Sequence, residues 1–292
     1  MAVKTIQYRG DYDDKLYWER VDRNLGWLGD TVEEQRARQE KLRDAVIGIV
    51  GTGGIGGAVA TRLVRMGARN LKLADPDNFD VTNIQRQLGA SLENVGRNKA
   101  EVVAEMAFEL TRDVNIDVYP QGITPETAEH FMDGCDYVMD QMEFYQVRNR
   151  YALHRAFRAS DRCRFMFKIP TVSHKVFVFT YTHDSMPIEE VYGLPEDTPI
   201  DEFATRRLME RIMPEIPDYP GKKMLDEWFV TMQRMPIFGA CPPMAEGILV
   251  ERLAQEIMDI PGRVPLPPQS GYAVFDSLTW EAKIVEKAWW AK

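Results

Sequence analysis

A glycine-rich segment near residue 50 constrains the fold of this chain more than any other feature. Residues 45–50 form a short apolar run without polar alternation, which predicts a buried parallel strand. The sequence G-T-G-G-I-G-G follows directly at 51–57, and residues 58–66 place apolar side chains at helical spacing. A strand, a glycine-rich turn and a helix in this order indicate the first half of a βαβ unit.

The spacing of these glycines predicts a nucleotide-binding turn. Gly51, Gly53 and Gly56 satisfy the pattern G-x-G-x-x-G. Gly54 lies in the same turn, and Asp75 ends the next predicted strand. Glycines allow a tight turn close to phosphate groups, which the helix N-terminus attracts, and the acid accepts hydrogen bonds from ribose hydroxyls. A tight turn without any ligand is the structural alternative.

The alternation of strands and helices continues to about residue 181. We expect helices at 99–112, 124–132 and 146–159, and strands at 71–74, 116–119, 137–139, 165–169 and 176–181. These elements predict an α/β fold of the Rossmann type, with a mostly parallel sheet and helices on both faces.

The rest of the chain is predicted to complete this domain. Prolines and acidic residues surround two expected helices in 182–236, so we interpret this stretch as an insertion that caps the functional edge of the sheet. A long helix at 244–258 and closing antiparallel strands at 272–275 and 282–285 are expected to follow. The predicted parts are an N-terminal arm with an entry helix (1–43), a nucleotide-binding core (44–181), the cap (182–236) and a C-terminal segment that completes the domain (237–292).

Charge and cysteine usage restrict the possible partners and compartment. The chain has 36 Lys and Arg against 45 Asp and Glu, a net charge of -9, which gives no general attraction for nucleic acid or anionic membranes. No stretch approaches ~18 uncharged apolar residues, and residues 1–14 contain no apolar signal-peptide core. Three scattered cysteines fit a reducing compartment. We therefore expect a cytoplasmic protein that binds neither nucleic acid nor membrane.

Polar side chains after the second strand favour ATP over a redox dinucleotide. The polar and cationic residues between 77 and 99 are Asp77, Asn83, Arg86, Gln87 and Lys99. A dinucleotide carries only a diphosphate, whereas attack on the α-phosphate of ATP releases pyrophosphate, whose charge an Arg and a Lys would neutralise. Arg86 and Lys99 suit that role, and a solvated surface pair is the alternative.

Three segments together resemble the ThiF/MoeB/HesA superfamily, the bacterial relatives of ubiquitin-activating enzymes. They are the glycine-rich turn, A-D-P-D-N-F-D-V-T-N-I-Q-R-Q at 74–87 and V-G-R-N-K-A at 95–100. Y-W-E-R at 17–20 also resembles the family's N-terminal arm, and D-Q-M-E-F-Y-Q-V-R at 140–148 resembles its D-C-T-D-N-x-x-x-R stretch. The likeness extends from residue 17 to about 180.

This resemblance implies adenylation of a substrate carboxylate by Mg-ATP. The carboxylate would belong to a peptide, a ubiquitin-like protein or a small-molecule acid. By position, Asp75 would hold the ribose, and the triphosphate would be lined by Asn83, Arg86, Gln87 and Lys99. Arg20 would reach into the neighbouring subunit's site, which implies a homodimer. An ordinary helix-surface charge is the alternative for Arg20.

The chain departs from the family pattern at its expected metal site. Glu143 stands where the family has a magnesium-binding Asp, and Phe144 replaces the usual Asn. Glu143 can still bind Mg²⁺ through oxygen, or Asp140 can serve instead.

Cysteine positions exclude two further features of some family members. Three isolated cysteines cannot form a four-thiolate site, so we predict no structural zinc. Residues 174–240 contain no cysteine, so we predict no enzyme thioester, and Cys241 is interpreted as a buried structural thiol.

The preferred hypothesis is an adenylyltransferase that passes the acyl adenylate directly to an acceptor, in peptide modification or in natural-product or cofactor biosynthesis. An NAD(P)-dependent oxidoreductase is the first alternative, because it needs only the glycine turn and Asp75. A non-catalytic partner that kept the fold is the second, and Glu143 is its one positive indication.

Overall fold

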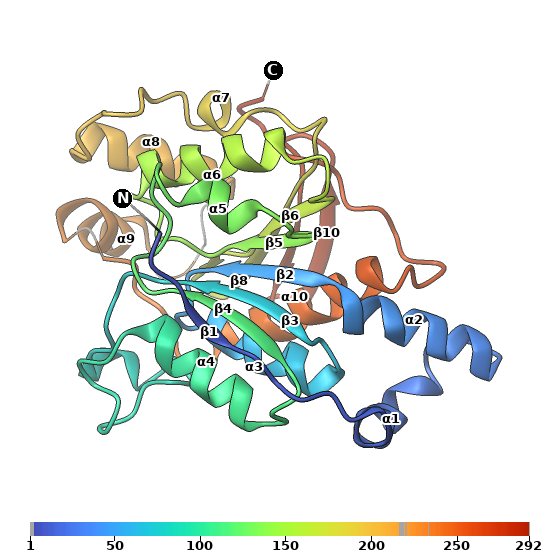
Figure 1. Ribbon diagram of the computed structural model, residues 1–292. Coiled ribbons are helices and arrows are strands. Elements are labelled where there is room, and N and C mark those ends of the chain that lie inside the picture. The colour runs from blue at the N-terminus through green and yellow to red at the C-terminus, as the bar shows by residue number, and fades with distance from the viewer. Residues whose placement is uncertain (1–2, 216–218, 220, 233, 292) are drawn as a thin grey trace.

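A ten-stranded sheet forms the centre of the molecule (Figure 1). The computed structural model describes residues 3–215, 219, 221–232 and 234–291, so 216–218, 220 and 233 of the predicted cap lie outside the described residues. The strand order is β1-β4-β3-β2-β5-β6-β8-β9-β10, and β7 pairs with β8. The strands are β1 (Ile6–Tyr8), β2 (Val46–Val50), β3 (Asn70–Ala74), β4 (Asn115–Tyr119), β5 (Tyr137–Asp140), β6 (Phe165–Lys168), β7 (Thr171–Val172), β8 (Lys175–Tyr181), β9 (Tyr272–Asp276) and β10 (Glu281–Val285).

The five strands β4, β3, β2, β5 and β6 run parallel and confirm the predicted Rossmann-type core. The order reverses at β2, because the chain adds β3 and β4 on one side of it and β5 and β6 on the other. Val50, the last residue of β2, pairs with Ala74 on β3 and with Asp140 on β5. The carboxyl ends of these strands therefore lie side by side at a topological switch point, where ligands bind in such sheets.

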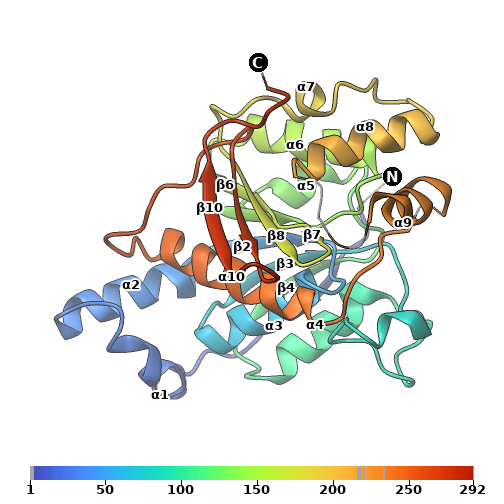
Figure 2. The same cartoon turned by 180° about the vertical axis from the view of Figure 1, so that it is seen from behind.

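Helices cover both faces of the sheet (Figures 1 and 2), because each face carries its own apolar cluster. One face packs against α2 (Val32–Asp44), α3 (Gly56–Met66), α4 (Lys99–Glu109) and α10 (Cys241–Ile257). The other packs against α5 (Ala128–Met132), α6 (Val147–Ala159), α7 (Ile188–Tyr192) and α8 (Glu202–Ile212). Strand β8 contributes side chains to both clusters. Val176 and Val178 belong to the cluster with α3 and α10, and Phe177 and Phe179 belong to the cluster with α6 and α8.

The C-terminal strands extend the sheet in antiparallel fashion, as predicted. Strand β8 pairs antiparallel with β6, β9 with β8 and β10 with β9. Helix α10 begins at Cys241, three residues before the predicted start at Met244, because Pro242 and Pro243 occupy its first turn. Proline is tolerated there, where its missing N–H would have no partner within the helix.

The cap contains more helical structure than the two helices expected. Within the described part of the chain, α7 and α8 are followed by the short α9 (Lys222–Asp226) and the π-helical η2 (Glu227–Thr231). Leu208 on α8 and Phe229 on η2 are buried in the apolar cluster that also contains α6. The cap is therefore joined to the core through a shared apolar cluster.

The sequence analysis missed two elements near the N-terminus and predicted one short helix too long. Strand β1 has only three residues and pairs antiparallel with β4 at the sheet edge. Helix α1 (Asp14–Leu25) begins after Asp13, whose side chain accepts from the Leu16 N–H. The helix expected from Thr124 begins only at Ala128, because the Thr127 hydroxyl accepts from the Thr124 N–H in a turn. No helix in the described residues is long and apolar enough to cross a membrane.

The glycine-rich turn is held by close backbone contacts that exclude any larger side chain. A Cβ atom on Gly56 would lie 1.9 Å from the carbonyl oxygen of Gly51. Gly51 itself has a φ of +89°, and a Cβ there would lie 2.5 Å from the carbonyl oxygen of Gln141. Glycine at these two positions is therefore required for β2 to turn directly into α3.

We predict that Gly56→Ala lowers the free energy of unfolding by at least about 2 kcal/mol, because the new methyl group forces the Gly51 carbonyl out of place. Gly247→Ala is the matched control, since Gly247 lies in α10 and a Cβ added there would have no atom within 4 Å. That control is expected to gain roughly 0.5–1 kcal/mol. Urea unfolding measures both, and equal stability of the two variants would contradict the crowding argument.

Candidate active site

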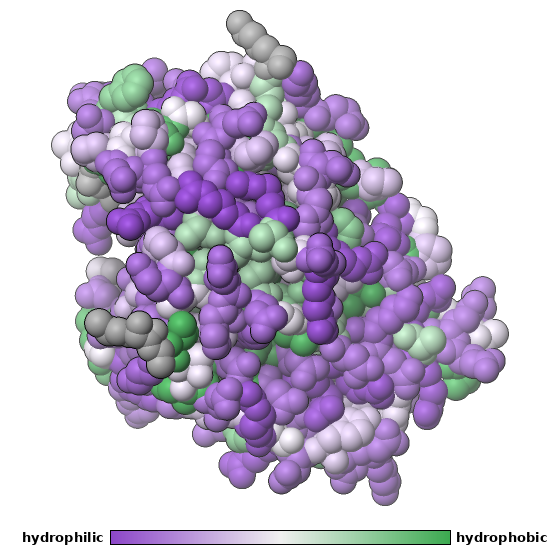
Figure 3. Space-filling model, turned by 45° about the horizontal axis from the view of Figure 1, so that its top comes forward, coloured by the Kyte–Doolittle hydropathy of each residue, from purple (hydrophilic) through white to green (hydrophobic). Residues whose placement is uncertain are grey.

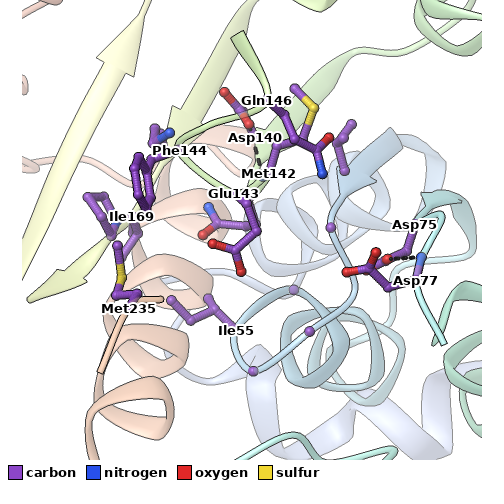
Figure 4. Close-up of a pocket in the computed structure, with 18 of the residues that line it drawn as sticks. Ile55, Asp75, Asp77, Asp140, Met142, Glu143, Phe144, Gln146, Ile169 and Met235 are labelled. Carbon is purple, nitrogen blue, oxygen red and sulfur yellow. Dashed lines mark hydrogen bonds between the residues drawn. The ribbon is translucent and has the colours of Figure 1, made fainter. Parts of the chain in front are cut away.

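A pocket lies over the switch point, at the carboxyl ends of β2, β3, β5 and β6 (Figure 4). It has an empty volume of about 1040 Å³, part of it open to solvent. The glycine-rich turn and the start of α3 form its floor, and Ile212, Met235 and Ile237 reach it from the cap and the segment that follows. The face in Figure 3 is mostly polar, with an apolar area in a central depression.

Asp75 joins the glycine-rich turn to the end of β3. Its carboxylate accepts from the Thr52 N–H at 2.7 Å and from the Asp77 N–H at 2.9 Å. Asp75 lines the pocket although it is buried, and burial raises the pKa of its carboxyl group. The predicted ribose-binding acid therefore also fixes the backbone of the turn.

Most of the residues predicted to line the triphosphate also line the pocket; we call this part of the pocket the triphosphate side. Lys99, the first residue of α4, places its Nζ 3.1 Å from Asp77 Oδ2. Arg86 donates from Nη1 to the Thr82 carbonyl at 3.1 Å, and burial lowers the pKa of Arg86 while nearby Glu143 raises it. The buried Oε1 of Gln87 has no hydrogen-bond partner among the described residues. Unsatisfied buried oxygens of this kind fit a site that receives a ligand.

Asn83 lies outside the lining of this pocket, contrary to its predicted role. Its Oδ1 accepts from the Asp80 N–H at 3.0 Å and closes the turn Val81–Asn83 (η1). The side chain is buried in that turn. Its position supports the loop that presents Arg86 and Gln87, since both of their backbone N–H groups donate to the Asn83 carbonyl.

The side chain of Arg20 is bound within its own chain. This argues against the predicted contact of Arg20 with the site of a neighbouring subunit. Its guanidinium donates to the Val64 carbonyl at 2.6 Å and pairs with Asp113 at 2.9 Å. Val64 lies near the C-terminal end of α3, whereas the pocket lies at the N-terminal end of that helix. The contacts of Arg20 are those of a residue that anchors α1, so we assign no catalytic contact to it.

Of the two predicted metal ligands, only Glu143 directs its carboxylate into the pocket (Figure 4). Asp140 also lines the pocket but is fully buried, and Arg150 Nε binds its Oδ2 at 2.7 Å. His154 lies 3.3 Å from the same oxygen, and the Met142 N–H donates to the other. Burial alone would raise the pKa of the Asp140 carboxyl, but Arg150 holds it well below its usual range. The described residues contain no cluster of three His, Cys, Asp or Glu side chains that could hold a metal ion by themselves.

Lys168 is a pocket residue that the sequence analysis missed. It is the last residue of β6 and only 5% exposed, and its Nζ has no hydrogen-bond partner among the described residues. Burial and the Arg150 charge lower the pKa of Lys168 to about 7, although Asp140 and Glu143 raise it. The available signal was a lysine at the carboxyl end of an otherwise apolar strand.

Apolar side chains form one part of the pocket wall. Phe144, next to Glu143, packs on Phe229 of the cap with ring centroids 6.0 Å apart. Ile169 and Met235 line the same side (Figure 4). Cys241 lies outside this lining, and its Sγ donates to the Ser173 carbonyl at 2.9 Å. Burial raises the pKa of this thiol, as expected for a structural cysteine.

Comparison with known proteins identifies relatives of the nucleotide-binding half. The ThiF family matches residues 21–173. The tRNA threonylcarbamoyladenosine dehydratase of Bacillus subtilis is 34% identical over 102 residues, which are 35% of this chain and 40% of that protein. The sulfur carrier protein ThiS adenylyltransferase of Escherichia coli is 32% identical over 102 residues, 35% of this chain and 41% of that protein. The matching segments therefore cover well under half of the length of these relatives.

Solved structures share the fold over almost the whole chain. The crystal structure of PaaA in its selenomethionine form has a TM-score of 0.67 and 16% identity, and covers 94% of this chain and 83% of PaaA. E. coli MccB with ATP has a TM-score of 0.64 and 17% identity, and covers 94% of this chain and 73% of MccB. The likeness thus includes the cap and the C-terminal strands, beyond the segment that the family matches.

We predict that Lys168→Met raises the free energy of unfolding by about 1–3 kcal/mol, because it removes a buried amine without a hydrogen-bond partner. The folded-state pKa lies below the value of about 10.4 for an unfolded lysine, so wild-type stability rises as pH increases between these values. The gain should therefore be largest below pH 7 and shrink toward pH 10. Urea unfolding at several pH values measures it, and a destabilised variant at pH 6 would contradict the expectation.

Proposed function

The chain belongs to the ThiF family, and from this premise we propose that it uses ATP to adenylate a substrate carboxylate, with release of pyrophosphate. The observation that carries the proposal is the position of two cations. Arg86 and Lys99 line the same pocket as the glycine-rich turn. A diphosphate bound at the helix N-terminus would need neither cation, whereas a departing pyrophosphate needs its charge neutralised.

The other pocket residues have compatible roles in this proposal. Phosphates bind at the N-terminus of α3, where the first N–H groups lack partners within the helix. Asp75 accepts hydrogen bonds from the ribose, and Gln87 and Asp77 complete the triphosphate side together with Lys99. A carboxylate is already ionised at neutral pH, so its attack requires positioning and charge stabilisation rather than a general base.

The donor set of the pocket also fits a magnesium ion that arrives with ATP. The Glu143 carboxylate faces the pocket and offers a hard oxygen ligand, and Mg²⁺ commonly binds to one or two carboxylates plus substrate phosphates. The ion would supply neutralisation of phosphate charge when bound. Asp140 instead shapes the loop that presents Glu143, because Arg150 and His154 occupy its oxygens.

The names of the relatives support a carboxylate substrate without selecting one. The E. coli relative is named as an adenylyltransferase of the sulfur carrier protein ThiS, and MccB was solved with ATP and with MccA. For this chain we propose a peptide, a protein C-terminus or a small-molecule acid, in peptide modification or biosynthesis. The dehydratase relatives act on tRNA by name, but the net charge of -9 favours no nucleic-acid partner here.

Two further features of the proposal rest on the cysteines. The chain forms no acyl thioester, because the three cysteines are all buried. We place the protein in the cytoplasm, since three free thiols suit a reducing compartment.

Thermal-shift measurements test the proposed function without knowledge of the acid. Mg-ATP at about 100 times its Kd is expected to raise the melting temperature by roughly 5 °C, because it binds only the native state. Lys99→Ala should lose this shift, because it removes one of the two cations proposed to bind the triphosphate. Lys41→Ala is the matched control, since Lys41 lies outside the pocket in an exposed pair with Asp259. Stabilisation by NADH or NADPH alone would support the oxidoreductase, and no response to any nucleotide would support the non-catalytic partner.

The proposed homodimer has a candidate interface that does not involve Arg20. Five apolar side chains between residues 81 and 95 are each at least 38% exposed, namely Val81, Ile84, Leu88, Leu92 and Val95. An exposed apolar group of this kind is typical of a surface that a partner covers. It lies in the loop that presents Arg86 and Gln87, so a second subunit would stabilise the triphosphate side.

Sedimentation at micromolar concentration tests this interface. The wild type is expected to sediment as a dimer, and Leu88→Asp with Leu92→Asp should convert it to a monomer, because two charges would be buried without partners. Leu278→Asp alters an exposed leucine outside this loop and should leave the dimer intact. A monomeric wild type, or a double variant that still dimerises, would contradict the assignment.

A further inference from the structure

Lys168 is a lining residue of the pocket whose buried amine has no partner among the described residues. A buried polar group without a partner costs stability, and such groups are rare in folded proteins. Its presence in the wall of a pocket therefore points to a ligand as the missing partner.

The charged groups around Lys168 do not supply that partner. Arg150 and His154 on α6 and Glu143 after β5 surround the end of β6 together with Asp140. The Asp140 oxygens already accept from Arg150 Nε, from Arg150 Nη2 and from the Met142 N–H. Because Arg150 neutralises Asp140, and no hydrogen bond joins Lys168 Nζ to Glu143, the Lys168 amine remains available for an anion in the pocket.

The location of Lys168 identifies which part of a ligand it would meet. The sheet order is β2-β5-β6, so the end of β6 lies two strands from the glycine-rich turn, on the order of 10 Å away. Lys99, at the start of α4, belongs to the opposite, β3 side of that turn. The pocket lining near the end of β6 includes Ile169, the residue after Lys168, together with Glu143 and Phe144 from the loop after β5. With Lys99 on the far side of the turn and Glu143 proposed to meet the phosphates through a magnesium ion, we assign the carboxylate of the acid to Lys168.

We propose that the Lys168 side chain binds the carboxylate of the acid substrate and stays on its acyl oxygen after adenylation. The inference rests on the proposed function and names its acyl-binding residue. One carboxylate oxygen forms the bond to the α-phosphorus as the bond to the pyrophosphate oxygen breaks, and pyrophosphate leaves with the electron pair. The second carboxylate oxygen keeps the hydrogen bond from Lys168, which itself forms no covalent bond.

Two stable nucleosides test this role without knowledge of the acid. They are 5′-O-(N-acetylsulfamoyl)adenosine, which carries a minimal acyl group, and 5′-O-sulfamoyladenosine, which lacks it. We expect calorimetry to show that the wild type prefers the acetylated compound. In Lys168→Met this preference should fall by roughly 10- to 100-fold, the usual effect of losing a hydrogen bond to a charged group. Binding of the compound without the acyl group should be unchanged.

Control variants separate recognition from folding. Lys168→Arg keeps a cation and should retain part of the preference. Lys72→Met removes a strand lysine that bonds to the Phe131 and Asp133 carbonyls outside the pocket, and should leave the preference unchanged. Circular dichroism and the melting temperature establish that each variant is folded.

The possible outcomes distinguish this inference from the proposed function. If the wild type binds both compounds but does not prefer the acetylated one, or if folded Lys168→Met keeps the preference, the role of Lys168 is overturned and adenylation is not. If the wild type binds neither compound nor Mg-ATP, the proposed function fails and this inference fails with it. A folded Lys168→Met that binds both compounds equally supports the inference.

Discussion

The fold and the pocket both depend on the contact between Gly56 and the Gly51 carbonyl, which leaves no room for a side chain. This contact lets β2 turn into α3 within a few residues and aims the N-terminus of α3 at the end of the sheet. Asp75 completes the arrangement, because its carboxylate binds the backbone of Thr52 in the turn and of Asp77 after β3. The same atoms thus determine the chain path and the place where phosphate would bind.

A second constraint, the buried pair of Asp140 and Arg150, acts on the other side of the pocket. Arg150 also donates to the Phe144 and Met142 carbonyls, so one guanidinium holds the loop after β5 in place. A buried ion pair of this kind is costly unless its remaining hydrogen-bonding groups are satisfied, and here several of them are. With Asp140 used for structure, Glu143 is left facing the pocket, and Phe144 links the loop to Phe229 of the cap. Phe144 therefore has a packing role.

Local pattern predicted most of the core, whereas side-chain partners distant in sequence were not predictable. The strand–turn–helix around Gly51 follows from spacing, because consecutive elements of a βαβ unit bring their ends together. For Arg86 and Lys99 the spacing also allowed a solvated surface pair, and the resemblance to the family favoured a place beside the turn. The position of Arg20 depends on Asp113, 93 residues away, which no pattern near Arg20 reveals. Lys168 was missed because a lysine that ends a strand is usually solvated, whereas tertiary packing leaves this one only 5% exposed.

The two sides of the pocket differ in how they relate to known proteins. The family match ends at residue 173, so it contains the glycine-rich turn, the cations of the triphosphate side and Lys168. Ile212, Met235 and Ile237, which close the acyl side, lie beyond it. A nucleotide is the same in every reaction of one type, whereas the acid differs, so under the proposed function we expect the wall outside the family segment to select the acid. Lys168 lies near the end of the family segment. There it would bind the carboxylate that all such acids share, next to the wall that would distinguish one acid from another.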